Sequence, residues 1–167
     1  VWHLLDVPSA VEMSTQACRW IYRHERGEIH VRAEAYSDPH EVSLMIEVAA
    51  GPPLRCLVSH HIALNGDDGS ILGPALWRIE GSDVVIGASA DSDVGRRFPD
   101  GRYRISAQPG TLFESVGGDE LLFLDGRTRR EPFVCIVTSA ASRVGLQICG
   151  ELIGDATYTT ALGESLK

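Results

Sequence analysis

Two adjacent histidines, His60 and His61, are the first residues of this chain whose type could serve catalysis. They lie in the apolar segment 54–64, which predicts a strand, and neighbours on a strand point to opposite faces. The two imidazoles therefore cannot grip one metal ion together. We expect one of them under a loop or inside a sheet and the other in solvent. Either remains a candidate as a catalytic base or a sugar contact.

Acidic residues in two loops offer the oxygen ligands that Ca²⁺ prefers. The first loop, 65–70, has the sequence NGDDGS, and the segment 88–95 contains Asp91 and Asp93. Neither follows the twelve-residue calcium loop, which ends in a bidentate acid. We expect polar turns at both places, with no metal and no cofactor.

A cluster of arginines, Arg127, Arg129 and Arg130, precedes Glu131 between two apolar segments. Its composition suits a solvated hairpin turn, and anion binding is the alternative. The sequence contains no GxSxG, HExxH, phosphate-loop or GxGxxG motif. Its acids are scattered, so spacing alone does not select a glycosidase pair.

The elements that would position these residues are strands. In the segment 28–36, EIHVRAEAY, apolar and polar residues alternate with the period of two that a half-buried strand requires. The polar face carries four candidate carbohydrate contacts, His30, Arg32, Glu34 and Tyr36. Aromatic rings bind the apolar face of a sugar ring, and polar neighbours fix its hydroxyls. Trp20 and Tyr22, on the partner strand of the same hairpin, would extend this surface if the register brings them to that side. Core or edge packing is the alternative for Trp20.

Similar short segments recur along the chain, separated by turn residues. Further strands are predicted at 19–24, 43–50, 54–64, 75–81, 83–89, 101–108, 120–126, 131–139 and 143–152. Residues 133–137 are apolar on both faces, which indicates a central strand. Residues 1–17 show little pattern beyond a possible helical turn, and residues 108–120 suggest a loop. About ten strands without intervening helices predict an all-β fold, an antiparallel two-sheet β-sandwich with little helix.

Composition limits the possible partners. The chain has 167 residues, enough for one domain (1–167), and a formal net charge of -8, which disfavours nucleic acid and anionic membranes. The four cysteines, which follow no metal-binding spacing, suggest reduced thiols and a cytoplasmic location. Cys135 and Cys149 would pair on oxidation only if they face each other across a hairpin. The chain begins with Val1 and not with Met, so we expect a piece excised from a longer polypeptide.

The segments WIYRHERGEIHVRAEAY (20–36) and LRCLVSHHIALNG (54–66) resemble the β-sandwich portions of large bacterial glycoside phosphorylase-like proteins. These proteins, the cellobiose-phosphorylase-like and cyclic β-1,2-glucan-synthase-like enzymes, carry a supersandwich domain beside an α/α-barrel. The resemblance covers about a quarter of the chain. It implies that the catalytic acid and the phosphate site belong to the barrel, so no catalytic residue can be carried over to this chain.

The resemblance implies a non-catalytic accessory domain of a bacterial carbohydrate-active enzyme of glycoside-phosphorylase type, which flanks or shapes a glucan site. Its expected partners are a weakly bound glucan or oligosaccharide, the rest of the parent polypeptide and possibly a second copy of the chain. Two alternatives stay open. One is an assembly module that touches no sugar. The other is a small mutarotase-type enzyme, which needs a histidine and a glutamate in one cleft.

Overall fold

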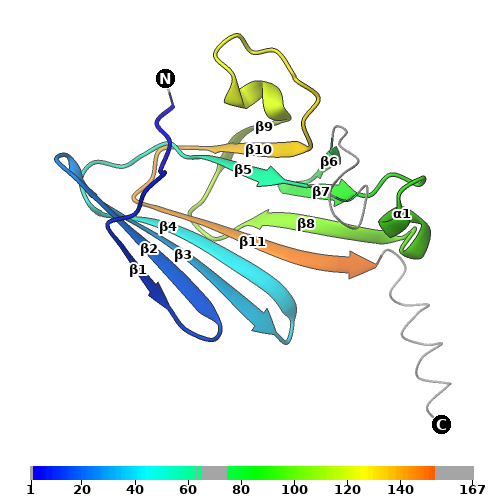
Figure 1. Cartoon of the computed structure of the whole chain (residues 1–167), viewed down its shortest axis with the longest axis horizontal. Coiled ribbons are helices and arrows are strands. Elements are labelled where there is room, and N and C mark those ends of the chain that lie inside the picture. Colours follow the sequence, from blue (N-terminus) through cyan, green and yellow to red (C-terminus); the bar gives the residue numbers. More distant parts are fainter. Residues whose placement is uncertain (1, 63, 65–74, 153–167) are drawn as a thin grey trace.

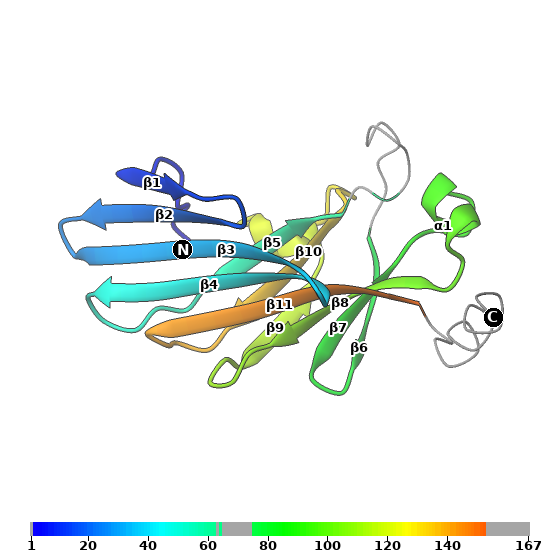
Figure 2. The same cartoon turned by 90° about the horizontal axis from the view of Figure 1, so that it is seen from below.

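Two antiparallel sheets of unequal size make up the structure (Figures 1 and 2). The computed structural model describes residues 2–62, 64 and 75–152. In the larger sheet the strand order is β1 (Ala10–Met13), β2 (Ala17–His24), β3 (Gly27–Ser37), β4 (His40–Ala50), β11 (Arg143–Leu152), β8 (Gly101–Ala107), β7 (Asp83–Gly87) and β6 (Leu76–Glu80). In the smaller sheet it is β5 (Leu57–His61), β10 (Phe133–Thr138) and β9 (Phe113–Gly117).

Helix is limited, in the described part of the chain, to two short segments. These are α1 (Asp93–Arg97) and the 3-10 helix η1 (Asp119–Leu122). The expected all-β sandwich with little helix is therefore confirmed. No helix among the described residues has the length and apolar character needed to cross a membrane.

Alternation along the strands gives the larger sheet an apolar and a polar face. Directly paired residues of antiparallel strands point to the same side. Val31 of β3 pairs with Ile46 of β4, which pairs with Val144 of β11, so these apolar residues form one row. Arg32 of β3 pairs in the same way with Met45 on the opposite face. The apolar face is the one that meets the smaller sheet.

The hydrophobic core lies between the smaller sheet and one half of the larger one. Its fully buried members come from β7, β8, β10 and β11: Val84, Ile86, Ile105, Val134, Ile136 and Leu146. Partly buried residues of β4, β5, β6 and β9 pack around them, including Leu44, Val58, Trp77 and Val116. None of the described cluster members comes from β1, β2 or β3. Half of the larger sheet therefore extends beyond the two-layer core.

Strand β10 is buried on both faces, as its apolar sequence predicts. It lies between β5 and β9, and all its residues from Val134 to Thr138 are buried. Val134 and Ile136 face the larger sheet within the core. Cys135 and Val137 point to the other side, where η1 packs. The prediction of a central strand at 133–137 is confirmed.

A polar clamp shapes the segment 118–131, which covers that other side. The carboxylate of Asp119 is buried and accepts hydrogen bonds from Thr128 Oγ1 (2.5 Å) and from the backbone N–H groups of Arg129 (2.6 Å) and Glu131 (3.3 Å). Burial alone would raise the pKa of Asp119, but these hydrogen bonds outweigh it, so the pKa lies below its ordinary value. Figure 1 shows the segment rising above β9 and β10.

The prediction of a strand at 120–126 is wrong, and so is the prediction of a loop at 108–120. Residues 119–122 form η1, while β9 occupies 113–117. The apolar run 121–124 imitates a buried strand, but the bonds of Asp119 with Thr128, Arg129 and Glu131 tie the two ends of the segment 118–131 together. Leu121 turns inward over Gly117, whereas Leu124 is almost fully exposed. A side-chain hydrogen bond across ten residues is not visible in local periodicity.

Smaller differences occur elsewhere. β1 occupies part of 1–17, where a helical turn was the only expectation, and β5 occupies 57–61 of the strand expected over 54–64. The segment 88–95, where a polar turn was expected, contains the start of α1, which begins because Ser92 Oγ accepts from the Gly95 N–H (2.9 Å).

The cysteines are free among the described residues, and the possible Cys135–Cys149 pair is excluded by topology. Cys135 lies in the smaller sheet, whereas Cys149 lies in β11 of the larger sheet. The two strands follow each other in sequence but do not form the hairpin that the pairing requires.

Because β10 is buried on both faces, a charge placed on the face towards η1 should lower the stability of the chain strongly. Val137 is 3% exposed. Val137→Asp should lower the free energy of unfolding by about 3 kcal/mol or more, because the carboxylate would be buried without a partner. Val11→Asp is the matched control, since Val11 is 47% exposed on the edge strand β1. Urea denaturation checks this, and equal effects of the two variants would contradict the burial of β10.

Candidate functional site

The four polar candidates of β3 lie on the face of the larger sheet that points away from the smaller sheet. His30 pairs with Glu47 of β4, and Tyr36 pairs with Glu41 of the same strand. His30 and Glu34 are half-buried, while Arg32 and Tyr36 are exposed. The alternation predicted for this strand is therefore confirmed, and the four side chains share one surface.

Ion pairs and hydrogen bonds link these side chains to one another. His30 Nε2 lies 2.6 Å from Glu28 Oε1, and Arg32 Nη2 lies 3.1 Å from Glu34 Oε2. A hydrogen bond with the Glu34 carboxylate raises the pKa of Tyr36. The pKa of Glu28 is lowered, first by its hydrogen bond with Arg23 and then by that with His30. His30, Arg32 and Glu34 are thus already paired, and they offer hydrogen-bonding edges beside the ring of Tyr36. Glu41 and Glu47 of β4 lie on the same face and form no ion pair with a described residue.

Trp20 and Tyr22 do not extend this surface. In the β2–β3 hairpin Trp20 pairs with Val31 and Tyr22 pairs with Ile29, so both rings lie on the apolar face. The residues of β2 that reach the polar face are the partners of His30 and Arg32, namely Ile21 and Arg19. The register of the hairpin therefore does not bring Trp20 and Tyr22 to the polar face. A shift of one residue would be needed, because it moves every side chain of a strand to the other face.

The two adjacent histidines point to opposite sides of β5, as expected. His60 pairs with Val134 and faces the core, whereas His61 is exposed and its ring meets Phe133 edge-on at 5.1 Å between centroids. Burial lowers the pKa of His60. Its Nε2 is buried and has no hydrogen-bond partner within the described part of the chain.

His60 lines a cavity of about 460 Å³ between the two sheets. The described lining is mostly apolar: Ser59, His60, His61, Ile62, Leu64, Ile86, Tyr103, Ile105 and Ile148. No carboxylate belongs to this described lining, so the histidine–glutamate pair of the mutarotase alternative does not form here. The arrangement suits a neutral imidazole in a largely apolar space.

The calcium candidates do not converge in the described residues. No group of three or more histidine, cysteine, aspartate or glutamate side chains in 2–62, 64 and 75–152 could hold a metal ion. Asp93 lies in the first turn of α1 and forms an ion pair with Arg96. The loop 65–70 lies outside the described residues.

The arginine cluster at 127–130 is a solvated loop, as its composition predicts. All three arginines are exposed. Arg129 forms an ion pair with Asp125 (2.7 Å) and its guanidinium lies over the ring of Phe123 at 4.0 Å. Its charge is thus already compensated within the loop.

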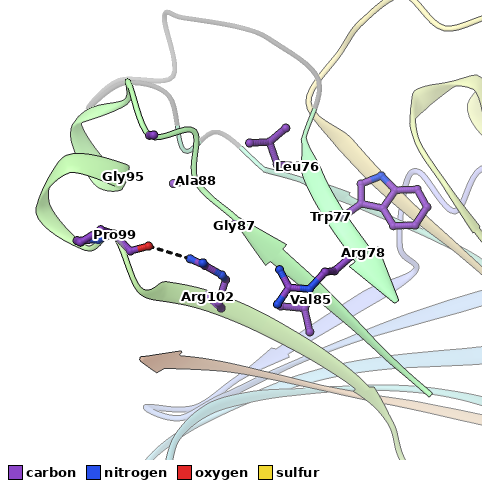
Figure 3. Close-up of a pocket in the computed structure, with 10 residues that line it drawn as sticks. Leu76, Trp77, Arg78, Val85, Gly87, Ala88, Gly95, Pro99 and Arg102 are labelled. Atoms are coloured by element: carbon purple, nitrogen blue, oxygen red, sulfur yellow. Dashed lines mark hydrogen bonds between the residues drawn. The ribbon is translucent and has the colours of Figure 1, made fainter. Parts of the chain in front are cut away.

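A second hollow, which sequence reasoning did not single out, lies where β6, β7 and β8 meet α1 (Figure 3). Its volume is about 350 Å³, and its lining includes Arg78, Gly87 and Arg102. Gly95 of α1 allows a close approach here, because a Cβ at this position would lie 1.9 Å from the Ser89 carbonyl oxygen. The alternation in 101–108 was the available signal, since it puts Arg102 and Arg104 on one face.

The buried imidazole predicts a pH dependence of stability. The folded-state pKa of His60 lies below the ordinary value of about 6.5, so the unfolded chain takes up the proton more readily. The full stability of the chain with a neutral, buried His60 is therefore present above the pKa of the unfolded state. It is lost as the pH falls from that value towards the lower pKa of the folded state. Relative to His60→Leu, the native chain should therefore lose stability between about pH 7.5 and 5.5.

Urea denaturation at both pH values measures this difference. His40→Leu is the control, because His40 is exposed at the start of β4. A difference between native chain and His60→Leu that does not change with pH would contradict the burial of this imidazole.

The comparison with known families adds to this geometry. The model of the family described as the glycoside phosphorylase supersandwich domain matches residues 1–150. A comparison with curated proteins found no match. The matched region contains β1 to β10 and residues 143–150 of β11, in the two antiparallel sheets described above. The chain therefore belongs to the family of glycoside phosphorylase supersandwich domains.

Proposed function

We propose that this chain is a non-catalytic accessory domain that flanks or shapes the glucan site of a glycoside phosphorylase-type protein. The observation that carries the proposal is its membership of the supersandwich family over residues 1–150. The described residues fit this role: His30 is paired with Glu28, Glu151 is paired with Arg104, and His60 lines a mostly apolar cavity whose described lining holds no carboxylate. The domain would act as a single unit beside a separate catalytic part of a longer bacterial polypeptide.

The proposed sugar contact is the polar face of β3. Tyr36 is 41% exposed and supplies the ring, while His30, Arg32 and Glu34 supply donors and acceptors on the same face. A sugar needs both, since its hydroxyls must keep hydrogen-bond partners when its apolar face is covered. A flat sheet surface with one ring supports weak binding, of millimolar order.

The cytoplasmic location is also part of this proposal. The cysteines among the described residues are free, and burial raises the pKa of Cys135 to about 11, which keeps this thiol protonated and unreactive. Thiols of this kind suit a reducing compartment.

A second candidate function is an assembly module without sugar contact. The uncovered part of the larger sheet favours it, because Val11, Met13 and Val42 expose apolar side chains outside the core. In that case the partner would be the rest of the parent polypeptide or a second copy of the chain.

The accessory role predicts that the isolated chain does not turn over glucans. Incubation of the purified chain with β-1,2- and β-1,4-linked oligoglucosides, with and without inorganic phosphate, should release neither glucose nor glucose 1-phosphate above the buffer level. A preparation of any active glycoside phosphorylase serves as the positive control. Release of glucose 1-phosphate by the chain alone would overturn the non-catalytic role.

The proposed contact surface predicts separate effects on binding and on stability. Tyr36→Ala should weaken the binding of an oligoglucoside, followed by chemical-shift changes on the labelled chain, and leave the melting temperature nearly unchanged. Tyr103→Ala is a matched control, because Tyr103 is 43% exposed but lies on the opposite face of the larger sheet.

Two results would contradict this assignment. An unfolded Tyr36→Ala variant would mean that Tyr36 supports the fold and not a ligand. Chemical shifts that stay constant over the whole polar face of β3 would favour the assembly module.

A further inference from the structure

The hollow between β6, β7, β8 and α1 contains the guanidinium of Arg102, which pairs with no acid in the part of the chain that the structure describes. The polar face of these strands carries three arginines, Arg78, Arg102 and Arg104. Arg104 forms ion pairs with Glu151 (2.7 Å), Asp83 (3.2 Å) and Glu80 (3.2 Å), and Arg78 forms one with Glu80. Within the described ranges Arg102 forms no ion pair, although it is only half-exposed.

Backbone carbonyls fix the orientation of Arg102. Its Nη1 donates to the carbonyl oxygens of Pro99 (3.2 Å) and Gly101 (2.6 Å), and Figure 3 shows the first of these bonds. The side chain lies over Gly87, the residue that pairs with it on β7. The guanidinium is therefore held in one place, whereas its Nε and Nη2 donate to no described protein group.

The remaining Nε–Nη2 edge has the geometry that carboxylates and phosphates recognise. Two parallel N–H donors on a planar guanidinium match two oxygens of one anion, and such bidentate bonds are stronger than those between neutral groups. A half-buried cation without a counter-charge also gains more from an anion than a fully solvated one does.

The walls of the hollow indicate what the anion must carry. Leu76, Val85 and Ala88 line it together with Pro99, so the space next to the guanidinium is partly apolar. Arg78 of β6 pairs with Val85 of β7 and follows Leu76 on the same face of the sheet (Figure 3). At about 350 Å³ the hollow is larger than one inorganic ion needs, which leaves room for a carbon skeleton.

We propose that this hollow is a binding site for a small organic oxyanion, a phosphate ester or a carboxylate, held by the Nε–Nη2 edge of Arg102. The site lies on strands other than β3 and does not depend on the proposed glucan contact. It can therefore be present when that contact fails, and the reverse also holds.

A titration of the full chain with glucose 1-phosphate, inorganic phosphate, glucuronate and uncharged glucose tests the proposal. The readout is the Nε–H resonance of Arg102 and the backbone signals of β6, β7 and β8 in the ¹⁵N-labelled chain. We expect at least one organic anion to shift them with a Kd of millimolar order, and glucose to have no effect. The phosphate and carboxylate arms identify the head group.

Variants separate a specific site from general attraction to positive charge. Arg102→Gln should weaken binding about tenfold or more, and Arg102→Lys, which keeps the charge but lacks the two-donor edge, should weaken it less. Arg26→Gln removes the same charge from an exposed turn between β2 and β3 and should change the Kd less than about twofold. Melting temperatures establish that each variant is folded. If Arg102→Gln does not fold, Arg102→Lys is the variant that tests the site.

Three outcomes would overturn the proposal. One is the absence of any shift at Arg102 with all three anions up to about 50 mM, far above a millimolar Kd. Another is equal weakening by Arg102→Gln and Arg26→Gln, which means non-specific attraction. The third is binding of uncharged glucose as tight as that of the anions.

Discussion

Strand β10 has no face that can meet water, and this constraint determines what surrounds it. Val134 and Ile136 need an apolar sheet on one side, and Cys135 and Val137 need a cover on the other. The larger sheet supplies the first, and the segment 118–131 supplies the second through its Asp119 clamp. A buried carboxylate in that cover is tolerated because three hydrogen-bond donors satisfy it. The larger sheet and the segment 118–131 thus each cover one face of the same apolar strand.

The same arrangement explains where polar chemistry can occur. Between the sheets, His60 is surrounded by aliphatic residues, which favour its neutral form. On the outer face of the larger sheet, charged side chains form ion pairs within a strand, as Arg32 does with Glu34, and between strands, as Arg104 does with Glu151. Arg102 stands out because it lies beside α1 and the Pro99–Gly101 turn, yet it forms no ion pair with Asp93 or Asp100 of these segments. The functional hypotheses for this domain therefore concern surfaces, and they assign it binding instead of catalysis.

Sequence periodicity predicts this fold well wherever local alternation and burial agree. The polar face of β3, the opposite orientations of His60 and His61 and the central position of β10 all follow from a period of two or from a fully apolar run. Sequence periodicity fails where a contact between residues far apart in the sequence determines the local structure. The register of β2 turns Trp20 and Tyr22 away from the polar face, and Asp119 converts an apolar run into a covering loop. The hollow at Arg102 depends on three strands and a helix that no single segment reveals.

The uneven coverage of the larger sheet should also affect how fast its amide protons exchange with solvent. Strands β1, β2 and β3 bury few apolar side chains, because no described member of the core cluster belongs to them and only Ile21 and Ile29 among their described residues are buried. Segments with few buried apolar contacts open locally at a lower free energy than the global unfolding. Amide protons should therefore exchange with solvent in a gradient across the sheet, slowest in β11 and β8 and fastest towards β1. A neighbour that covers the apolar side of β1–β3 would abolish this gradient, so the exchange pattern would report directly on whether that side is occupied.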